Sequence, residues 1–157
     1  MSSRLFIVDT NVLVAGLITS QPSSPTVQVL DAMLDGRLLY LLSPALLREY
    51  RQVLLRPKLA RLHGLSENEV DRLLTELTAN ALWREPATVP QESAPDPGDD
   101  HLWALLASEP GAILVTGDRL LLDNPRTGSA VDCIGTALAD AGVGTESIWR
   151  RVKCCKK

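Results

Sequence analysis

Two short apolar runs, each leading into an aspartate, constrain the fold of this chain most strongly. Residues 4–8 (RLFIV) lead into Asp9, and residues 112–116 (AILVT) lead through a glycine into Asp118. Neither run alternates apolar with polar residues, which is typical of strands buried on both faces, as in a parallel sheet. Because ligands of such sheets bind beyond the carboxyl ends of the strands, both aspartates are expected to project toward a ligand site.

The segments between these runs carry helical patterns. Helices are expected over residues 10–18, 26–34, 44–55 and 66–81, and over a segment that begins at Asp99 or Asp100 and ends near Pro110. Strands are expected over 38–42 and within 83–89, and loops over 90–98 and 123–129, whereas 130–131 and 135–144 carry no clear pattern. The alternation of buried strands with helices predicts an α/β domain around a mainly parallel sheet.

The size and composition limit the class of protein. At 157 residues, with 45% hydrophobic and 22% charged residues, the chain is expected to form one globular domain over 1–157. No apolar run reaches the roughly 18 residues of a membrane span, and the N-terminus lacks a signal-peptide pattern, so a cytoplasmic location with no membrane association is expected. The net charge of -3 means that any nucleic acid must be held by a local basic surface.

The cysteines and histidines argue against a disulfide framework and against a zinc site. Cys133, Cys154 and Cys155 lack paired spacing and are expected to be free thiols. His63 and His101 stand alone in the sequence, which leaves too few ligands for zinc.

Four acidic residues form a candidate metal site instead. Asp9 and Asp118 end strands, Glu49 lies in a helix, and Asp100 opens a helix after a loop. Mg²⁺ and Mn²⁺ prefer oxygen ligands and keep several waters, so a few carboxylates from separate elements suffice. Such a cluster repels itself, so at least one of its acids should have an elevated pKa when no metal is bound. Bound metal would activate water for attack on a phosphodiester.

Each acid also has a structural alternative. Asp9 could cap the helix that follows it, Asp118 could be a turn residue, and Glu49 could be solvated. Asp99 and Asp100 compete for one helix N-cap, so one can be structural while the other is a ligand. Function is favoured at Asp9, because Asp-Thr-Asn offers more polar groups than one cap requires. Thr10, Asn11 and Thr116 are expected to orient carboxylates by hydrogen bonds.

Residues 8–13 (VDTNVL) and 114–118 (LVTGD) resemble PIN domains, especially the PIN-family toxin components of bacterial and archaeal toxin–antitoxin pairs. Residues 43–61 look like the family segment that carries the second acid on a helix, which gives that role to Glu49. Residues 96–100 (DPGDD) are similar to the third acidic motif, whose ligand best matches Asp100, with Asp99 as the alternative. The resemblance covers about 4–132, and the segment 133–157, with its basic tail, departs from it.

This resemblance implies a three-layer α/β/α fold and a Mg²⁺- or Mn²⁺-dependent ribonuclease, with dimerisation and often a cognate antitoxin. Asp9, Glu49, Asp100 and Asp118 would be its catalytic metal ligands. A weakly active or inactive PIN-like module that binds RNA or a protein is the main alternative. A haloacid-dehalogenase-type phosphotransferase would require a second aspartate where this chain has Asn11.

Basic residues close to Glu49 in the sequence are expected to guide RNA toward the metal. Arg48, Arg51 and Lys58 are the candidates, although a solvated helix face would carry the same charges. Trp103 could stack on a base, but its apolar neighbours favour packing in the core.

Overall fold

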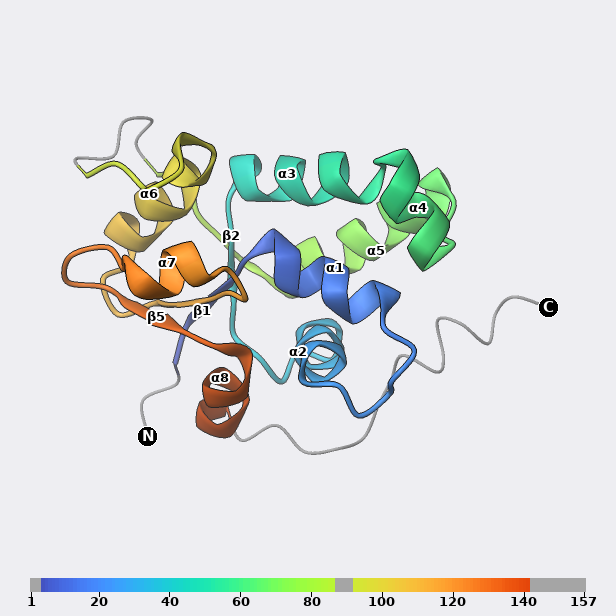
Figure 1. Ribbon diagram of the computed structural model, residues 1–157, viewed down its shortest axis with the longest axis horizontal. Coiled ribbons are helices and arrows are strands. Elements are labelled where there is room, and N and C mark those ends of the chain that lie inside the picture. Colours follow the sequence, from blue (N-terminus) through green and yellow to red (C-terminus); the bar gives the residue numbers. More distant parts are fainter. Residues whose placement is uncertain (1–3, 87–91, 142–157) are drawn as a thin grey trace.

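The computed structural model describes residues 4–86 and 92–141 (Figure 1). The strands are β1 (Phe6–Val8), β2 (Leu41–Leu42), β3 (Leu82–Trp83), β4 (Ile113–Val115) and β5 (Ala130–Asp132). The helices are α1 (Thr10–Ile18), α2 (Pro25–Leu34), α3 (Pro44–Leu54), α4 (Pro57–His63), α5 (Glu67–Asn80), α6 (Asp100–Ser108), α7 (Arg119–Asp123) and α8 (Ile134–Ala141), with a 3₁₀ turn, η1 (Pro97–Asp99), before α6. Strands and helices alternate, as the α/β prediction requires.

The strand pairs formed by the described residues are all parallel. β1 pairs with β4, β4 with β5 and β2 with β3, and a bridge between Phe6 and Tyr40 joins the two groups. The resulting order is β3-β2-β1-β4-β5. The direction in which strands are added reverses beside β1, so the β1–β4 boundary is the switch point where ligands of open α/β sheets bind.

Helices cover both faces of this sheet. Parallel crossovers are almost always right-handed, so connections that run in opposite directions along the sheet lie on opposite faces. In Figure 1, α1 to α5 lie on one side of the strands, and α6 and α7 lie on the other. The fold is therefore a three-layer α/β/α arrangement, and the predicted fold class is confirmed.

Local sequence signals set the helix starts that position the site. The Ser43 hydroxyl accepts a hydrogen bond from the Leu46 amide at the start of α3, and Pro44 occupies its first turn. Ser66 and Glu69 form the predicted capping box at the start of α5. These caps satisfy amides that have no partner within their helices.

The core is built on the two apolar runs, because every residue of β1 and β4 is buried. Trp103 is only 1% exposed, so it packs in the core and is not available to stack on a base. Gly16 allows α1 to lie close to α2, because a Cβ there would meet the Thr26 carbonyl oxygen at 2.8 Å. The free Cys133 thiol is exposed, as expected, and Cys154 and Cys155 lie outside the described residues.

Most differences from the predicted elements concern short segments. Pro57 ends α3 as predicted, but it also occupies the first turn of a new helix, α4. The patterns do not predict α7, β5 or α8, and β2 is shorter than predicted. Elements of two to eight residues contain too few repeats for a hydrophobic period to emerge. Residues 87–91, part of the expected 83–89 strand and 90–98 loop, lie outside the described residues.

No helix among residues 4–86 and 92–141 combines the length and the apolar character needed to cross a membrane.

Candidate functional site

Asp9 lies at the centre of the site, where β1 gives way to α1. It is buried, and its Oδ1 accepts a hydrogen bond of 2.8 Å from the Thr10 amide, which makes it the N-cap of α1. Its Oδ2 accepts hydrogen bonds from the Thr116 hydroxyl (2.7 Å) and the Asn11 amide nitrogen (3.3 Å). The cap therefore uses one carboxylate oxygen, and the other lies among polar groups from a different part of the chain.

Thr116 connects the ends of the two neighbouring strands. Its hydroxyl donates to Asp9 and accepts from the Asp118 amide at 3.0 Å. The Asn11 side chain reaches the same point, because its Oδ1 accepts from the Gly117 amide at 3.2 Å. Asp118 caps α7 through Oδ1, which accepts from the Leu120 amide. The two aspartates thus lie at the same edge of the sheet.

Glu49 comes to this edge from α3. The Thr10 hydroxyl donates to its Oε2, which joins the start of α1 to α3. The same Oε2 lies 3.4 Å from His101 Nε2 at the start of α6. On the next residue of α3, the buried Tyr50 hydroxyl donates to the Val8 carbonyl oxygen, immediately before Asp9. Two adjacent residues therefore fix α3 against the strand that ends in Asp9.

Asp99 and Asp100 have different environments. Asp100 Oδ1 accepts a hydrogen bond of 2.8 Å from the Ala94 amide, so this carboxylate holds the preceding loop. Asp99 instead joins Glu49 and His101, and one ligand atom from each of the three lies within 4.8 Å of those of the other two. The structure therefore brings Asp99 into the acidic group and gives Asp100 a loop partner.

The pKa values of two of these acids are raised, first by burial and then by the charges of neighbouring acids. Burial raises the pKa of Asp9, hydrogen bonds from Thr116 and Thr10 lower it, and the charges of Glu49 and Asp118 raise it, with a net increase. Burial and the charges of Asp9, Asp96 and Glu49 raise the pKa of Asp99 to about 6. Within the predicted cluster the pKa is therefore elevated at Asp9, and it is elevated as well at Asp99, the alternative to Asp100.

Glu49 is the exception within the group. Burial on its own would raise its pKa, but contacts from His101 and Thr10, together with the charge of Arg56, hold it below its usual value. The charged form of Glu49 is therefore favoured, next to two acids whose pKa values are raised. Such a set of oxygen atoms has the donor chemistry that a hard divalent ion prefers.

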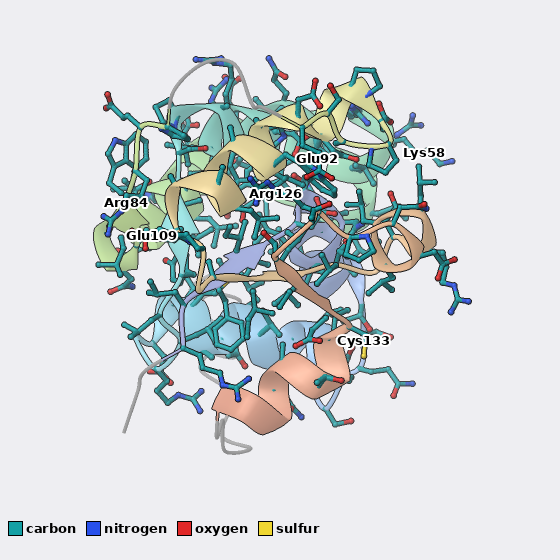
Figure 2. All side chains as sticks on the ribbon, turned by 90° about the vertical axis from the view of Figure 1, so that its left-hand side faces the viewer. Lys58, Arg84, Glu92, Glu109, Arg126 and Cys133 are labelled. Atoms are coloured by element: carbon teal, nitrogen blue, oxygen red, sulfur yellow. The ribbon has the colours of Figure 1, made fainter. Side chains whose placement is uncertain are left out.

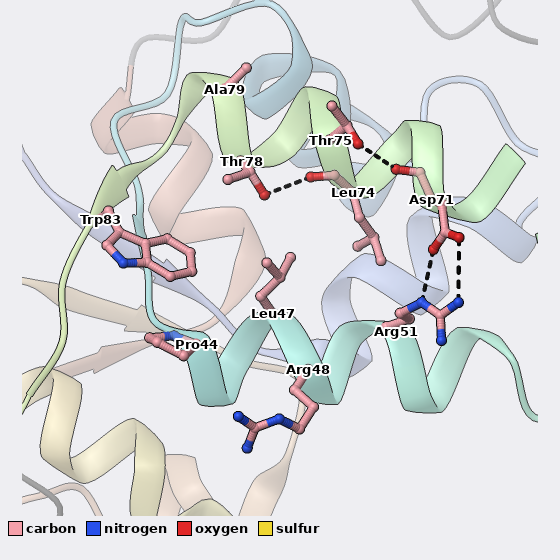
Figure 3. Close-up of a pocket in the computed structure, with 10 residues that line it drawn as sticks. All are labelled: Pro44, Leu47, Arg48, Arg51, Asp71, Leu74, Thr75, Thr78, Ala79 and Trp83. Carbon is pink, nitrogen blue, oxygen red and sulfur yellow. Dashed lines mark hydrogen bonds and ion pairs between the residues drawn. The ribbon is translucent and has the colours of Figure 1, made fainter. Parts of the chain in front are cut away.

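The basic residues named from the sequence lie on different surfaces. The Arg51 guanidinium donates to Asp71 at 2.8 Å and to Glu67 at 2.8 Å, so α3 is tied to α5. Arg48 and Arg51 line a groove of about 760 Å³ between α3 and α5, with Leu47 and Leu74 at its centre and Trp83 at one end (Figure 3). This groove lies on the face of α3 that turns away from Glu49.

Lys58 and Arg126 are exposed to different degrees around the side of the molecule shown in Figure 2. Lys58 lies in the first turn of α4, is exposed, and appears at the rim of this view. Arg126 lies near its middle, half-buried, and donates to the Thr127 carbonyl and the Ser129 hydroxyl.

His101 is the site residue that sequence reasoning missed. A histidine isolated in the sequence gives no ligand spacing, so the pattern argued only against zinc. The available signal was its position directly after Asp99 and Asp100. Residues in the first turn of a helix all lie near the same end of that helix, so His101 was bound to lie close to these two acids.

Comparison with known proteins agrees with this architecture. A model of the PIN domain family matches residues 6–120, which include the segments that carry all of the acids described above. The uncharacterized protein MJ1680 of Methanocaldococcus jannaschii is 29% identical over 116 residues, which cover 74% of this chain and 72% of that protein. No solved structure matches the chain significantly. The matched span, the parallel sheet and the acids at its switch point lead to one conclusion: this chain belongs to the PIN domain family, whose fold is of the nuclease type.

Proposed function

We propose that this protein, as one PIN unit over residues 1–157, is a ribonuclease that hydrolyses RNA phosphodiester bonds with the help of Mg²⁺ or Mn²⁺. The observation that carries the proposal is the gathering of Asp9, Glu49, Asp99 and Asp118 from four separate elements, with the pKa raised at two of them. A protein gains no stability from burying carboxylates that also repel one another. A bound cation removes it, and this is the reason we assign to the cluster.

The residues fit a hard divalent ion. Ligand atoms of Glu49, Asp99 and His101 already lie within 4.8 Å of one another. The charge of Asp9 raises the pKa of Asp99, and the charge of Asp118 raises the pKa of Asp9. In this proposal Asp9, Glu49, Asp99 and Asp118 hold the metal. Asp100, the better match to the family motif, holds the loop through Ala94 and thereby positions Asp99.

Bound metal would supply a water nucleophile near neutral pH and offset the charge that develops on the phosphate. The chain's own contribution is to fix the carboxylates before metal and substrate arrive. Thr116 and Asn11 hold Asp9 Oδ2, and the Thr10 hydroxyl holds Glu49 Oε2. Groups fixed in this way need little rearrangement on binding, which is the physical basis of preorganised catalysis.

Basic side chains near the cluster would contact the RNA backbone. Lys58 remains our candidate here, and Arg56 joins it because its charge acts on Glu49. Arg48, also predicted to bind RNA, lines the groove on the other face of α3 and would contact RNA only there. Arg51 is already paired with two acids, so we assign it mainly a structural part. Replacing Lys58 or Arg56 by alanine should weaken RNA binding and reduce its dependence on salt, because each phosphate contact releases counterions. An unchanged salt dependence would remove this assignment.

We further propose that the protein acts in the cytoplasm as the toxin of a toxin–antitoxin pair and forms a homodimer. This rests on the likeness of residues 8–13 and 114–118 to PIN-family toxins. Growth arrest on expression, reversed by co-expression of a small gene beside this one, would support the toxin role. A protein that remains monomeric at high concentration in sedimentation experiments would contradict the dimer.

The central test is cleavage of a labelled RNA by purified protein with Mn²⁺, with Mg²⁺ and with a chelator. We expect cleavage only with metal, and none by the Asp118→Asn variant with an unchanged far-UV circular dichroism spectrum. Asp99→Asn should reduce cleavage more than Asp100→Asn, whose effect should be on thermal stability. RNA binding without cleavage under every metal condition would favour the alternative of an inactive RNA-binding module.

A further inference from the structure

The imidazole of His101 lies at the site, but the proposed arrangement of four carboxylate ligands gives it no role. His101 is half-buried at the start of α6, with a side chain that is 17% exposed. Both ring nitrogens are buried, and neither makes a hydrogen bond within the described part of the chain. A buried polar nitrogen without a hydrogen bond loses the solvation it had in water and gains nothing in return.

The position of His101 Nε2 is that of a ligand rather than of a hydrogen-bond donor. It lies 3.4 Å from Glu49 Oε2, whereas a charge-assisted hydrogen bond from imidazolium to carboxylate measures about 2.7–2.9 Å. Two atoms that each bind one ion at about 2.1 Å, with angles between octahedral and tetrahedral, lie about 3.0–3.4 Å apart. The separation of Nε2 and Oε2 falls at the upper end of that interval.

Asp99 completes the same group from the residue two positions before His101. Its carboxylate lies within 4.8 Å of the other two ligand atoms. The three residues come from two elements that contact each other, α3 and the η1–α6 corner. Their ring and carboxylate groups are each half-buried, so an ion between them would be partly shielded from water and still reachable by a substrate.

From this geometry we infer that His101 Nε2 is a metal ligand, together with Glu49 and Asp99, and that it biases the site toward a first-row transition ion over Mg²⁺. The inference rests on the proposed metal site and names its ion class. Imidazole is a good ligand for transition ions, whereas Mg²⁺ prefers oxygen alone. The Nδ1 atom would then carry the ring proton, as in other metal-bound histidines.

The test is metal binding, measured without substrate. Transition ions bind most sites more tightly than Mg²⁺, so the informative quantity is the change in the ratio of affinities when His101 is replaced. Isothermal titration of the wild type and the His101→Asn variant with Co²⁺ and with Mg²⁺ gives that ratio. Mg²⁺ serves as the internal control in each protein, because a damaged fold would lower both affinities together.

We expect His101→Asn to weaken Co²⁺ binding at least about tenfold and to change Mg²⁺ binding less than about twofold. In the Co²⁺-loaded wild type, one strongly shifted, exchangeable proton signal from the ring N–H should appear in the NMR spectrum and be missing from the variant. Equal Co²⁺ affinity in the two proteins would overturn the role of His101 and leave the ribonuclease proposal standing. A wild type that binds neither ion would overturn both.

Discussion

The charged residues on the two faces of α3 differ in the partners that they meet. On one face, Glu49 meets Asp9 and Asp99, and the pKa values of these two aspartates are raised. On the other, Arg51 donates hydrogen bonds to Asp71 that hold the pKa of that carboxyl below its usual value. The charges on the Arg51 face (the outer face) are paired within the chain, whereas the carboxylates on the Glu49 face (the inner face) repel one another. One face of α3 thus stabilises the fold, and the other carries carboxylates whose charges a bound cation would offset.

The largest difference between the faces should appear in catalysis. Replacing Glu49 by glutamine keeps its size and removes a proposed metal ligand, so we expect RNA cleavage to fall at least about 100-fold. Replacing Arg51 by glutamine, two residues along the same helix, should change cleavage only about twofold to threefold. Initial rates measured at saturating Mn²⁺ compare the two variants. Similar losses in both would break the distinction between the faces.

Metal should stabilise the protein through the inner face alone. At a metal concentration about 100 times its dissociation constant, binding to the native state adds about 2.7 kcal/mol to the free energy of unfolding. Thermal melts should show this increase for the wild type and for Asp71→Asn, and not for Asp9→Asn. An equal increase in Asp9→Asn would place the bound ion elsewhere.

Substitutions of two buried tyrosines can distinguish an effect on stability from an effect on the geometry of the site. Tyr50 donates to the Val8 carbonyl beneath Asp9, and Tyr40 donates to the Leu77 carbonyl on the side of α5. Replacing either one by phenylalanine leaves a buried carbonyl without this partner, which should cost about 1–1.5 kcal/mol in urea unfolding. Only Tyr50→Phe should also weaken Mn²⁺ binding. If Tyr40→Phe weakened it as much, the effect would be general loosening of the fold.

The stability of the protein without metal should also depend on pH. The pKa of Asp99 is about 6 in the native protein and near 3.8 when unfolded, so the native state binds more protons between these values. Stability therefore falls as pH rises from about 4 to about 6, and the loss is complete above that range. Urea unfolding with a chelator at pH 4.5 and pH 7 measures this slope. It should be smaller in Asp99→Asn, and an unchanged slope would assign the titration to another group.

The sequence predicted the elements that carry long or distinctive patterns. The buried runs before Asp9 and Asp118 gave the parallel strands, and Ser43-Pro44 and Ser66 marked the starts of α3 and α5. It did not predict α4 or α7, because a helix of five to seven residues is held by its neighbours more than by its own pattern. Trp103 shows that local pattern also settles burial where apolar residues surround a side chain.

The sequence by itself determined which residue types stand at the ends of β1 and β4, because an apolar run and the polar residue that closes it are adjacent in the chain. Only the tertiary structure decided which of two neighbouring acids, Asp99 or Asp100, faces Glu49, and that His101 meets the same carboxylate. These choices depend on how α6 rotates against α3, about 50 residues away in the chain. Such a rotation is set by packing across the sheet, which no local pattern records.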